Sequence, residues 1–297
     1  MATYVMARTV EEAVAAMAGG ARAIAGGTDL VVGGRQGKKP LPESLVGIHR
    51  VAGLASMQET TDGLILGALV THAAIVTDDR IQARYSGLAD ASALVGSHAT
   101  RANGTIGGNV MNASPAMDTG APLLCLGAQA EMVSPGGSRL VDLAGLWTGP
   151  GTTSAQADEL LVSIRIPLPA EGTGSSYVRL QYRRQMEIAV VGAGVALTMR
   201  DGLVTHAAIA IASLAPTIHR VAEAEAALVG TDAGPAAVEA ASGAAAAAAR
   251  PIGDVRASAD YRRAMAAVIT RRAIQAALAR ARGETVPIPA SESTYGS

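Results

Sequence analysis

The sequence predicts an α+β fold made of two parts. Apolar runs of strand length recur between segments of helical pattern, and both kinds lie on either side of the linker-like stretch AEGTGS at residues 170–175. At 297 residues the chain is long enough for two domains. We therefore expect a first domain over residues 1–174, a second over residues 175–284, and a polar tail over residues 285–297.

The first domain opens with a capping box, Thr9 and Glu12, which predicts a helix over residues 10–18 closed by Gly19. A strand at 21–25 (ARAIA) then runs into a glycine pair. Further patterns predict strands at 45–48 and 63–69, a turn at 60–63, helical structure over 71–94 broken near 86–87, a buried helix over 121–130, a strand at 131–133, a hairpin at 135–139 and a strand over 158–167. Pro167 and Pro169 end that last strand.

The second domain combines long apolar runs with alanine-rich helical segments. It is expected to hold strands at 176–182, 189–199 and 205–215, a hairpin turn at 201–204, and helices over 221–229, 235–250 and 259–282. The apolar content of 49% is dominated by alanine and valine, which predicts a core of small side chains packed closely.

Composition excludes several classes of function. The net charge of −1 gives no general attraction to nucleic acid or anionic membranes, and one tryptophan with no phenylalanine makes base-stacking platforms unlikely. The single cysteine, Cys125, cannot hold an iron–sulfur cluster, which usually needs four thiolates, and the five histidines lack metal-site spacing. With no signal-peptide pattern and no apolar run long enough to span a bilayer, we expect a cytoplasmic protein.

The chain is organised around two glycine-containing bends. The first, IAGGTDL at Ile24–Leu30, offers Thr28 and Asp29 as possible caps for the next element of the chain; the second, ANGTIGGNVMNASPAMD at Ala102–Asp118, contains Gly104, Gly107 and Gly108. Successive bare amides in such bends form a concave nest that suits a phosphate or pyrophosphate. Each bend alone is more typical of an ordinary turn, whereas the two bends together fit a dinucleotide site as well as they fit two turns.

Other candidate side chains have plainer interpretations. The basic residues Arg35, Lys38 and Lys39 fit a solvated turn better than a phosphate contact. His98 fits a surface position just before the bend at Ala102–Asp118. Cys125, within PLLCLGA, is expected to be an inert buried thiol.

Six motifs resemble, in order, those of the FAD-binding medium subunits of molybdenum hydroxylases, the group of xanthine dehydrogenase and aerobic carbon monoxide dehydrogenase. They cover nearly the whole chain and are AGGTDL at 25–30, RxNGTIGGN at 101–109, ASPAMD at 113–118, DELLVSIRIP at 158–167, RRQMEIAVV at 183–191 and YRRAMAAVITRRAI at 261–274. The resemblance implies a vanillyl-alcohol-oxidase-type (PCMH-type) FAD-binding domain, with subdomains of about residues 1–55 and 56–174. A C-terminal α+β domain of the CO dehydrogenase flavoprotein type would follow, with FAD between them.

The resemblance also implies a set of cofactor-binding residues and no catalytic side chain. Those expected around the diphosphate are Ala23, Ile24, Ala25, Gly26, Gly27, Thr28, Asp29, Leu30, Thr105, Ile106, Gly107, Gly108 and Asn109. Asp118 would bind the ribose or adenine end, Leu161 would make an adenine-side backbone contact, and Arg179 and Ile188 would lie at the flavin ring. From the residues alone, Asp118 fits equally well as a helix N-cap, and Ile188 as plain core.

The function implied is that of an FAD-carrying electron-transfer subunit, an oxidoreductase component. Substrate would be oxidised at a molybdenum cofactor on a large partner chain. Electrons would pass through [2Fe-2S] clusters of a small partner chain to FAD here and on to an external acceptor, in a dimer of heterotrimers. The cofactor would carry the redox chemistry, and the protein would supply position and potential.

Two departures from the family argue against CO as the substrate. The family's CO dehydrogenases look like AGGHS where this chain has AGGTD at 25–29, and they usually carry tyrosine at the position of Ile188. Two other functions stay open: a self-contained flavin reductase of the same fold, related to the UDP-N-acetylenolpyruvoylglucosamine reductases, and a non-catalytic assembly subunit that has lost flavin.

Overall fold

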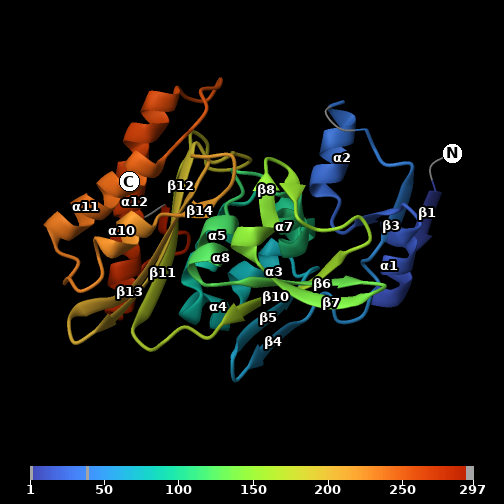
Figure 1. Cartoon of the computed structure of the whole chain (residues 1–297), viewed down its shortest axis with the longest axis horizontal. Coiled ribbons are helices and arrows are strands. Elements are labelled where there is room, and N and C mark those ends of the chain that lie inside the picture. Colours follow the sequence, from blue (N-terminus) through green and yellow to red (C-terminus); the bar gives the residue numbers. More distant parts are fainter. Residues whose placement is uncertain (1–2, 38–39, 292–297) are drawn as a thin grey trace.

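Three main sheets succeed one another along the chain in the computed structural model, which describes residues 3–37 and 40–291 (Figure 1). The first is a small parallel sheet of order β1-β3-β2. Its region consists of β1 (Thr3–Met6), α1 (Val10–Ala18), β2 (Arg22–Ile24), α2 (Thr28–Arg35) and β3 (Ser44–Gly47). The predicted capping box is confirmed, since the Thr9 hydroxyl accepts a hydrogen bond from the Glu12 amide and Gly19 ends α1.

The second sheet is antiparallel, with strand order β4-β5-β10-β6-β7. Its strands are β4 (Met57–Thr60), β5 (Gly63–Gly67), β6 (Gln129–Ser134), β7 (Gly137–Asp142) and β10 (Leu160–Pro167), and β8 (Trp147–Gly149) with β9 (Thr152–Thr153) forms a separate ribbon. The helices of this region are α3 (His72–Thr77), α4 (Asp79–Arg84), α5 (Ser86–Leu94), α6 (His98–Asn103), α7 (Ile106–Asn112), α8 (Gly120–Cys125) and α9 (Leu143–Leu146).

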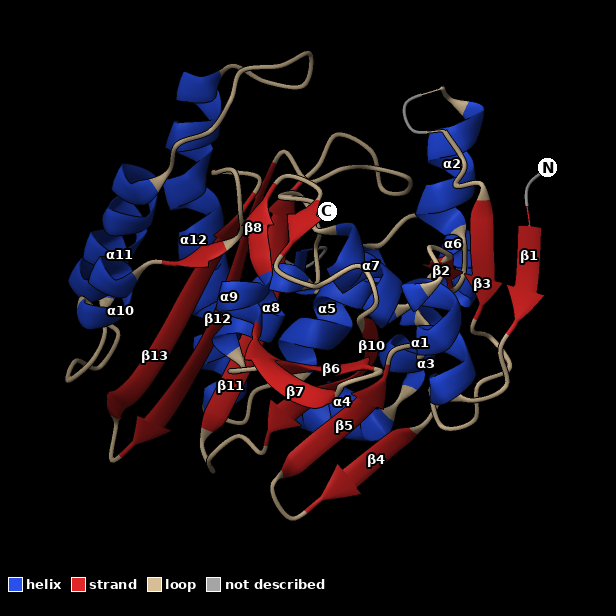
Figure 2. Cartoon of the chain, turned by 45° about the vertical axis from the view of Figure 1, so that its right-hand side comes forward, coloured by secondary structure: helices blue, strands red, loops and turns tan. Residues whose placement is uncertain are grey.

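The third sheet has strand order β11-β12-β13-β14 and is antiparallel. Its region consists of β11 (Thr173–Leu180), β12 (Val191–Arg200), β13 (Leu203–Ala212), β14 (His219–Arg220), α10 (Ala222–Ala226), α11 (Pro235–Ala248) and α12 (Ala259–Ala281). Helix α12 packs on one face of this sheet, with α11 against it, and α5 and α8 pack on the other face (Figure 2). The third sheet is therefore shared between the two parts of the molecule.

Several local predictions need correction. Strand β4 was not predicted, and the segments containing α6 and α7, predicted as loop, are helical. The helical stretch over 71–94 breaks at Asp78 as well as at Tyr85, because the Asp78 carboxylate caps α4. Strand β11 begins at Thr173, inside the predicted linker. Helices of six or seven residues span fewer than two turns, which is too short for their periodicity to be read from sequence.

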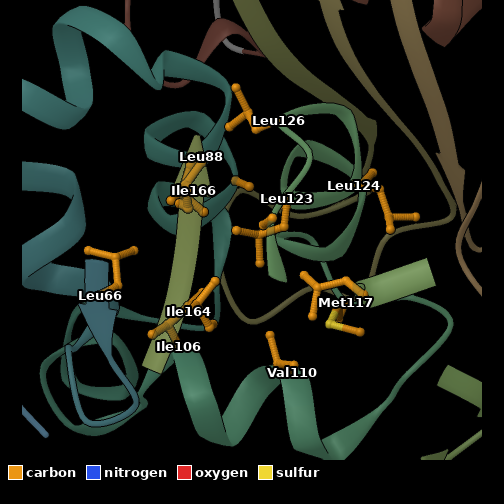
Figure 3. Close-up of a cluster of buried hydrophobic side chains, with 14 of the residues drawn as sticks. Leu66, Leu88, Ile106, Val110, Met117, Leu123, Leu124, Leu126, Ile164 and Ile166 are labelled. Atoms are coloured by element: carbon orange, nitrogen blue, oxygen red, sulfur yellow. The ribbon is translucent and has the colours of Figure 1, made fainter. Parts of the chain in front are cut away.

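The core divides into a part with large side chains and a part with small ones. Around α7, α8 and β10 it is rich in leucine and isoleucine, including Leu123, Ile106 and Ile164 (Figure 3). Between the third sheet and α11–α12 it is dominated by alanine and valine. The predicted core of small side chains is thus right only for the second part.

The C-terminal segment is not a free polar tail over its described residues. Ala290 and Ser291 are fully buried, and the Ala290 amide donates to the Asp90 carboxylate over 2.9 Å. Residues 292–297 of that predicted tail, like Lys38 and Lys39, lie outside the described residues. None of the helices in the described ranges is both long and apolar enough to cross a bilayer.

Candidate functional site

The first bend joins strand β2 to helix α2. Gly27 adopts a left-handed conformation, with φ of 69°, and is the N-cap residue of α2. Thr28 and Asp29, expected as caps, are instead the first residues inside the helix, and no side chain caps its N-terminus. The first amides of α2 therefore point out of the helix without a capping side chain, an arrangement that favours an anion.

The second bend is the N-terminus of helix α7 rather than an open loop. Thr105 caps it, because its hydroxyl accepts a hydrogen bond from the Gly108 amide over 3.1 Å. The amides of Ile106 and Gly107 donate to the carbonyls of Val70 and Ala68 over 2.9 and 3.0 Å. Since a backbone amide donates once, the polar groups of this bend that remain for a ligand are the Thr105 hydroxyl proton and the side chain of Asn109.

The two bends lie against each other. A Cβ atom built on Gly26 would fall 1.9 Å from the carbonyl oxygen of Asn103, and one built on Gly104 would fall 3.5 Å from Oγ1 of Thr28. Only residues without a side chain allow the two backbones to come this close. The fold thus brings together segments that are about 75 residues apart in the sequence.

Asn109 and Asp118 are both engaged with other side chains. The Thr119 hydroxyl donates to Oδ1 of Asn109 over 2.6 Å, which leaves the Asn109 amide group free to turn outwards. Asp118 is buried and accepts from the Tyr177 hydroxyl over 2.9 Å and from the Arg179 guanidinium over 2.7 Å. It makes no N-cap bond to α8, so the alternative role in helix capping is wrong.

Arg179, fully buried on β11, links the two parts of the molecule. Its guanidinium pairs with Asp118 and also donates to Gln181 Oε1 over 2.8 Å. Burial raises the pKa of the Asp118 carboxyl, while the positive charge of Arg179 and the Tyr177 hydroxyl oppose that shift. Arg179, expected at the flavin ring, therefore contacts Asp118, which was expected at the ribose or adenine end of FAD.

Leu161 is buried, whereas Ile188 is exposed. Leu161 is buried on β10, beside a bulge in the pairing of β10 with β6. Ile188, in the loop between β11 and β12, leaves 48% of its surface exposed, so its interpretation as plain core is wrong. Ala23, Ile24, Ala25 and Leu30 are half-buried around the first bend.

Two further side chains near the bends were not found by sequence reasoning. His72 is buried at the start of α3, where its amide donates to the Gly104 carbonyl and its ring nitrogen lies 3.5 Å from the Ser92 hydroxyl. Arg101 lies within 3.3 Å of the ring of His98, and burial together with the charge of Arg179 lowers its pKa. His72 belongs to no motif, and Arg101, although it opens the motif at 101–109, was given no role, so only the fold reveals their contacts.

The hollows of the described chain lie elsewhere. One is bordered by Pro167, Thr198 and His206, and another by Pro235, Glu239 and Arg271 between α11 and α12. Histidine, cysteine and acidic side chains of the described residues form no cluster of three that could hold a metal ion.

Two family descriptions match the chain. Residues 1–169 match the FAD binding domain in molybdopterin dehydrogenase, and residues 176–277 match the CO dehydrogenase flavoprotein C-terminal domain. Among curated proteins, the chain is 35% identical to the carbon monoxide dehydrogenase medium chain of Afipia carboxidovorans, over 88% of this chain and 90% of the relative. It is 30% identical to the nicotine 6-hydroxylase medium subunit of Paenarthrobacter nicotinovorans, over 80% and 83% of the two chains.

Similar solved structures come from enzymes of the same kind as these relatives. Carbon monoxide dehydrogenase from Hydrogenophaga pseudoflava matches with a TM-score of 0.90 and 34% identity, covering 94% of this chain and 98% of the other. Quinoline 2-oxidoreductase from Pseudomonas putida 86 matches with a TM-score of 0.87 and 28% identity, covering 95% and 98%.

Proposed function

Because this chain belongs to the FAD-binding medium subunits of the molybdenum hydroxylases, we propose that it is the electron-transfer subunit of such a complex. A small partner chain with [2Fe-2S] clusters delivers electrons to FAD held here, and an external acceptor removes them. A large partner chain holds the molybdenum cofactor. The assembly is a cytoplasmic dimer of heterotrimers, and this chain divides near residues 170–175 into its FAD-binding and C-terminal domains.

The contact between the two bends is the observation that carries this proposal. Gly26 meets the backbone of Asn103, and Thr28 lies beside Gly104, so the uncapped start of α2 adjoins the start of α7. A dinucleotide diphosphate needs several donors in one place, and this junction brings the uncapped amides of α2 beside the segment that ends in the Thr105 cap of α7. The residues present therefore fit the diphosphate of FAD.

The chain's own residues position the cofactor. The amides at the start of α2 bind the diphosphate, helped by the hydroxyls of Thr28 and Thr105 and by the Asn109 side chain. The exposed face of Ile188 covers the ring system and excludes water from it. Asp118 accepts one hydrogen bond on each oxygen, from Tyr177 and Arg179, and its remaining lone pairs would accept a hydroxyl of the ribose end.

The chemistry of transfer would come from FAD, which can take up electrons singly and release them singly or in pairs. No side chain of this chain has to transfer a proton to substrate. The relatives named for carbon monoxide, nicotine and xanthine act on dissimilar molecules, which agrees with substrate selection on the large chain.

The visible spectrum and metal content of the purified complex test the proposal. We expect flavin absorbance with about one FAD per chain, and co-purification of one chain that contains iron and another that contains molybdenum. A yellow chain that purifies alone and oxidises a soluble substrate would identify a self-contained flavin reductase. A colourless chain with its fold intact would identify an assembly subunit without flavin.

A further inference from the structure

A hollow lies where the two parts of the molecule join, and it has three walls. The end of α8 forms the first wall through Cys125 and Leu126, and residues 167–170, which connect β10 to β11, form the second. One end of the third sheet forms the third wall. We call this cavity the joint hollow; its volume of about 330 Å³ falls in the size range of small-molecule sites. None of the residues that line it belongs to the site proposed for FAD.

The sheet wall of the joint hollow carries a row of polar side chains. Thr173 of β11 lies opposite Thr198 of β12, which in turn lies opposite His206 of β13, so all three project from one face of the sheet. Arg200 follows two residues after Thr198 and lines the hollow from the same face. The hydroxyls of Thr173 and Thr198 share one hydrogen bond of 2.7 Å, which leaves one of their two protons for a ligand.

A β-bulge directs His206 to this wall. The register of β12 with β13 shifts after Thr198, and Thr205 lies opposite no residue of β12. The consecutive residues Thr205 and His206 therefore both line the joint hollow, although neighbours in a regular strand point to opposite faces. The Thr205 hydroxyl donates to the Thr198 carbonyl over 3.3 Å, so His206 is the group of this strand that remains for a ligand.

The basic groups of the sheet wall are not balanced by carboxylates. Neither the Arg200 guanidinium nor the His206 ring makes an ion pair or a hydrogen bond within residues 3–37 and 40–291. On the neighbouring strand β14, by contrast, Arg220 is paired with Glu225. A guanidinium fork matches the two oxygens of a carboxylate, and a nearby imidazole adds a further donor. This wall therefore favours an anion.

The other two walls are largely apolar. Leu126, Pro167 and Leu168 present carbon atoms to the joint hollow. Burial raises the pKa of the Cys125 thiol to about 12, so the thiol stays neutral and does not repel an anion. A ligand that is polar all round would leave these walls against water or against charge, whereas a ligand with an apolar body covers them.

We propose that the joint hollow binds a small organic carboxylate, an anion with a short apolar body. Its carboxylate pairs with Arg200 and accepts hydrogen bonds from His206 and from the Thr173–Thr198 hydroxyl pair, while its body packs on the apolar walls. Because such a ligand contacts α8, the connecting segment and the third sheet at once, its binding stabilises the joint between the two parts. The site involves neither FAD nor a partner chain, so it is tested separately from the proposed function.

Three probes of different chemistry test the ligand class. In a ligand-observed NMR titration of the FAD-loaded chain, cyclohexanecarboxylate should bind with a dissociation constant of about 1 mM or lower. Cyclohexanecarboxamide, which has the same shape without the charge, and inorganic phosphate, which has no apolar body, should each bind at least about tenfold more weakly. Absence of carboxylate binding, or equal binding of either of the other probes, overturns the proposal.

An arginine substitution tests the location. Arg200→Gln should weaken binding of cyclohexanecarboxylate at least about tenfold, because the charge and the two-pronged contact are both lost. The matched control is Arg50→Gln, which removes an exposed arginine outside the joint hollow that also has no ion pair in the described chain. The control should stay within about twofold of wild type, and both variants should keep the wild-type melting temperature.

A crystal structure of the FAD-loaded chain with cyclohexanecarboxylate locates the ligand directly. The carboxylate should lie on the guanidinium of Arg200, with the ring against the apolar walls of the joint hollow. A carboxylate bound anywhere else overturns the proposal, as does unchanged affinity in Arg200→Gln.

Discussion

At the residue scale, the adjacent glycines 107 and 108 serve different purposes. A Cβ atom on Gly107 would fall 2.6 Å from the Ala68 carbonyl oxygen, so this glycine allows α7 to pack against the strand end. Gly108 is exposed, and the nearest atom to its Cβ position is Oγ1 of Thr105 at 3.0 Å. Sequence reasoning gave both glycines the same role at the diphosphate, but the Gly107 amide donates to Ala68 and the Gly108 amide to the Thr105 hydroxyl, so Gly108 differs only in the open space beside it.

The variants Gly108→Val and Gly107→Val should therefore differ. Gly108→Val should fold normally but lose FAD, because a branched side chain fills the space beside the Thr105 hydroxyl, which is proposed to bind the diphosphate. Gly107→Val should lose about 1–3 kcal/mol or more of unfolding free energy through its clash with Ala68. The ratio of flavin to protein absorbance, with thermal unfolding, distinguishes them; a folded Gly108→Val that retains one FAD per chain contradicts the assignment.

His72 adds a pH dependence to the stability of this region. Burial, with a smaller contribution from the Arg101 charge, lowers the pKa of His72 from 6.5 to about 4. The unfolded chain takes up this proton near pH 6.5, so between pH 6.5 and 4 it binds more protons than the folded chain. The stability that depends on a neutral, buried His72 is complete above pH 6.5 and is lost as the pH falls towards 4.

His72→Leu should flatten this dependence. Protonation of His72 should lower the free energy of unfolding of the wild-type chain by up to about 3 kcal/mol between pH 6.5 and 4. The variant should lack this contribution to the dependence of unfolding free energy on pH. Urea titrations at a series of pH values measure it. Equal slopes for His72→Leu and wild type would refute the buried neutral state.

At the scale of elements, the ion pair of Asp118 and Arg179 connects the turn before α8 with strand β11. Both side chains are buried, and Tyr177, on the same strand, adds its hydroxyl to Asp118. Removing one member of such a pair leaves a buried charge unbalanced, which costs far more than the pair itself contributes. The two elements should therefore be coupled energetically.

A double-mutant cycle measures that coupling. Arg179→Met should lower the free energy of unfolding by about 3–5 kcal/mol, and Asp118→Asn combined with it should recover part of the loss because the buried charge is gone. Guanidinium unfolding of the two single variants and the double variant gives the interaction energy. Strictly additive losses would show that the pair does not couple the two parts.

Which elements could be predicted depended on their length and their local signals. The capping residues of α1, the 23 residues of α12 and the strand pattern of β10 each contain enough sequence to identify them. Helix α7 spans seven residues, two of them glycine, so its local signal is that of a turn. The glycine bends themselves were predicted, because small residues in a row are visible in sequence.

The contacts that complete the site could not be predicted. Asp118 and Arg179 are 61 residues apart and share no periodic pattern, so nothing local links them. The same holds for His72 and Gly104, whose backbone hydrogen bond lies beside an isolated antiparallel bridge between Thr71 and Thr105. Resemblance named Asp118 and Arg179 without showing that they touch each other.

At the scale of the whole molecule, the C-terminal segment locks the two parts together. Asp90 on α5 accepts hydrogen bonds from the Tyr177 and Ala290 amides and pairs with Arg280 of α12. The Ser291 hydroxyl accepts from the Arg179 amide over 3.1 Å. One buried carboxylate thus joins the N-terminal helices, the third sheet and the chain end.

Deletion of residues 286–297 should therefore destabilise the whole chain. The deletion removes one of the donors to the Asp90 carboxylate and the Ser291 acceptor of the Arg179 amide, and it exposes the apolar surface under Val286 and Ile288. We expect the melting temperature to fall by roughly 4 °C or more relative to a chain shortened by residues 292–297 alone. Equal melting temperatures for the two truncations would contradict this locking role.

Hydrogen–deuterium exchange of the chain with and without FAD tests the central claim most directly, since it reports on the amides that the claim invokes. The account predicts that FAD slows exchange most in peptides covering residues 26–30, at the uncapped start of α2, with a smaller effect at residues 105–109, where the amides of Ile106 and Gly107 are already hydrogen-bonded. Stoichiometric FAD binding with no protection at residues 26–30 would contradict it.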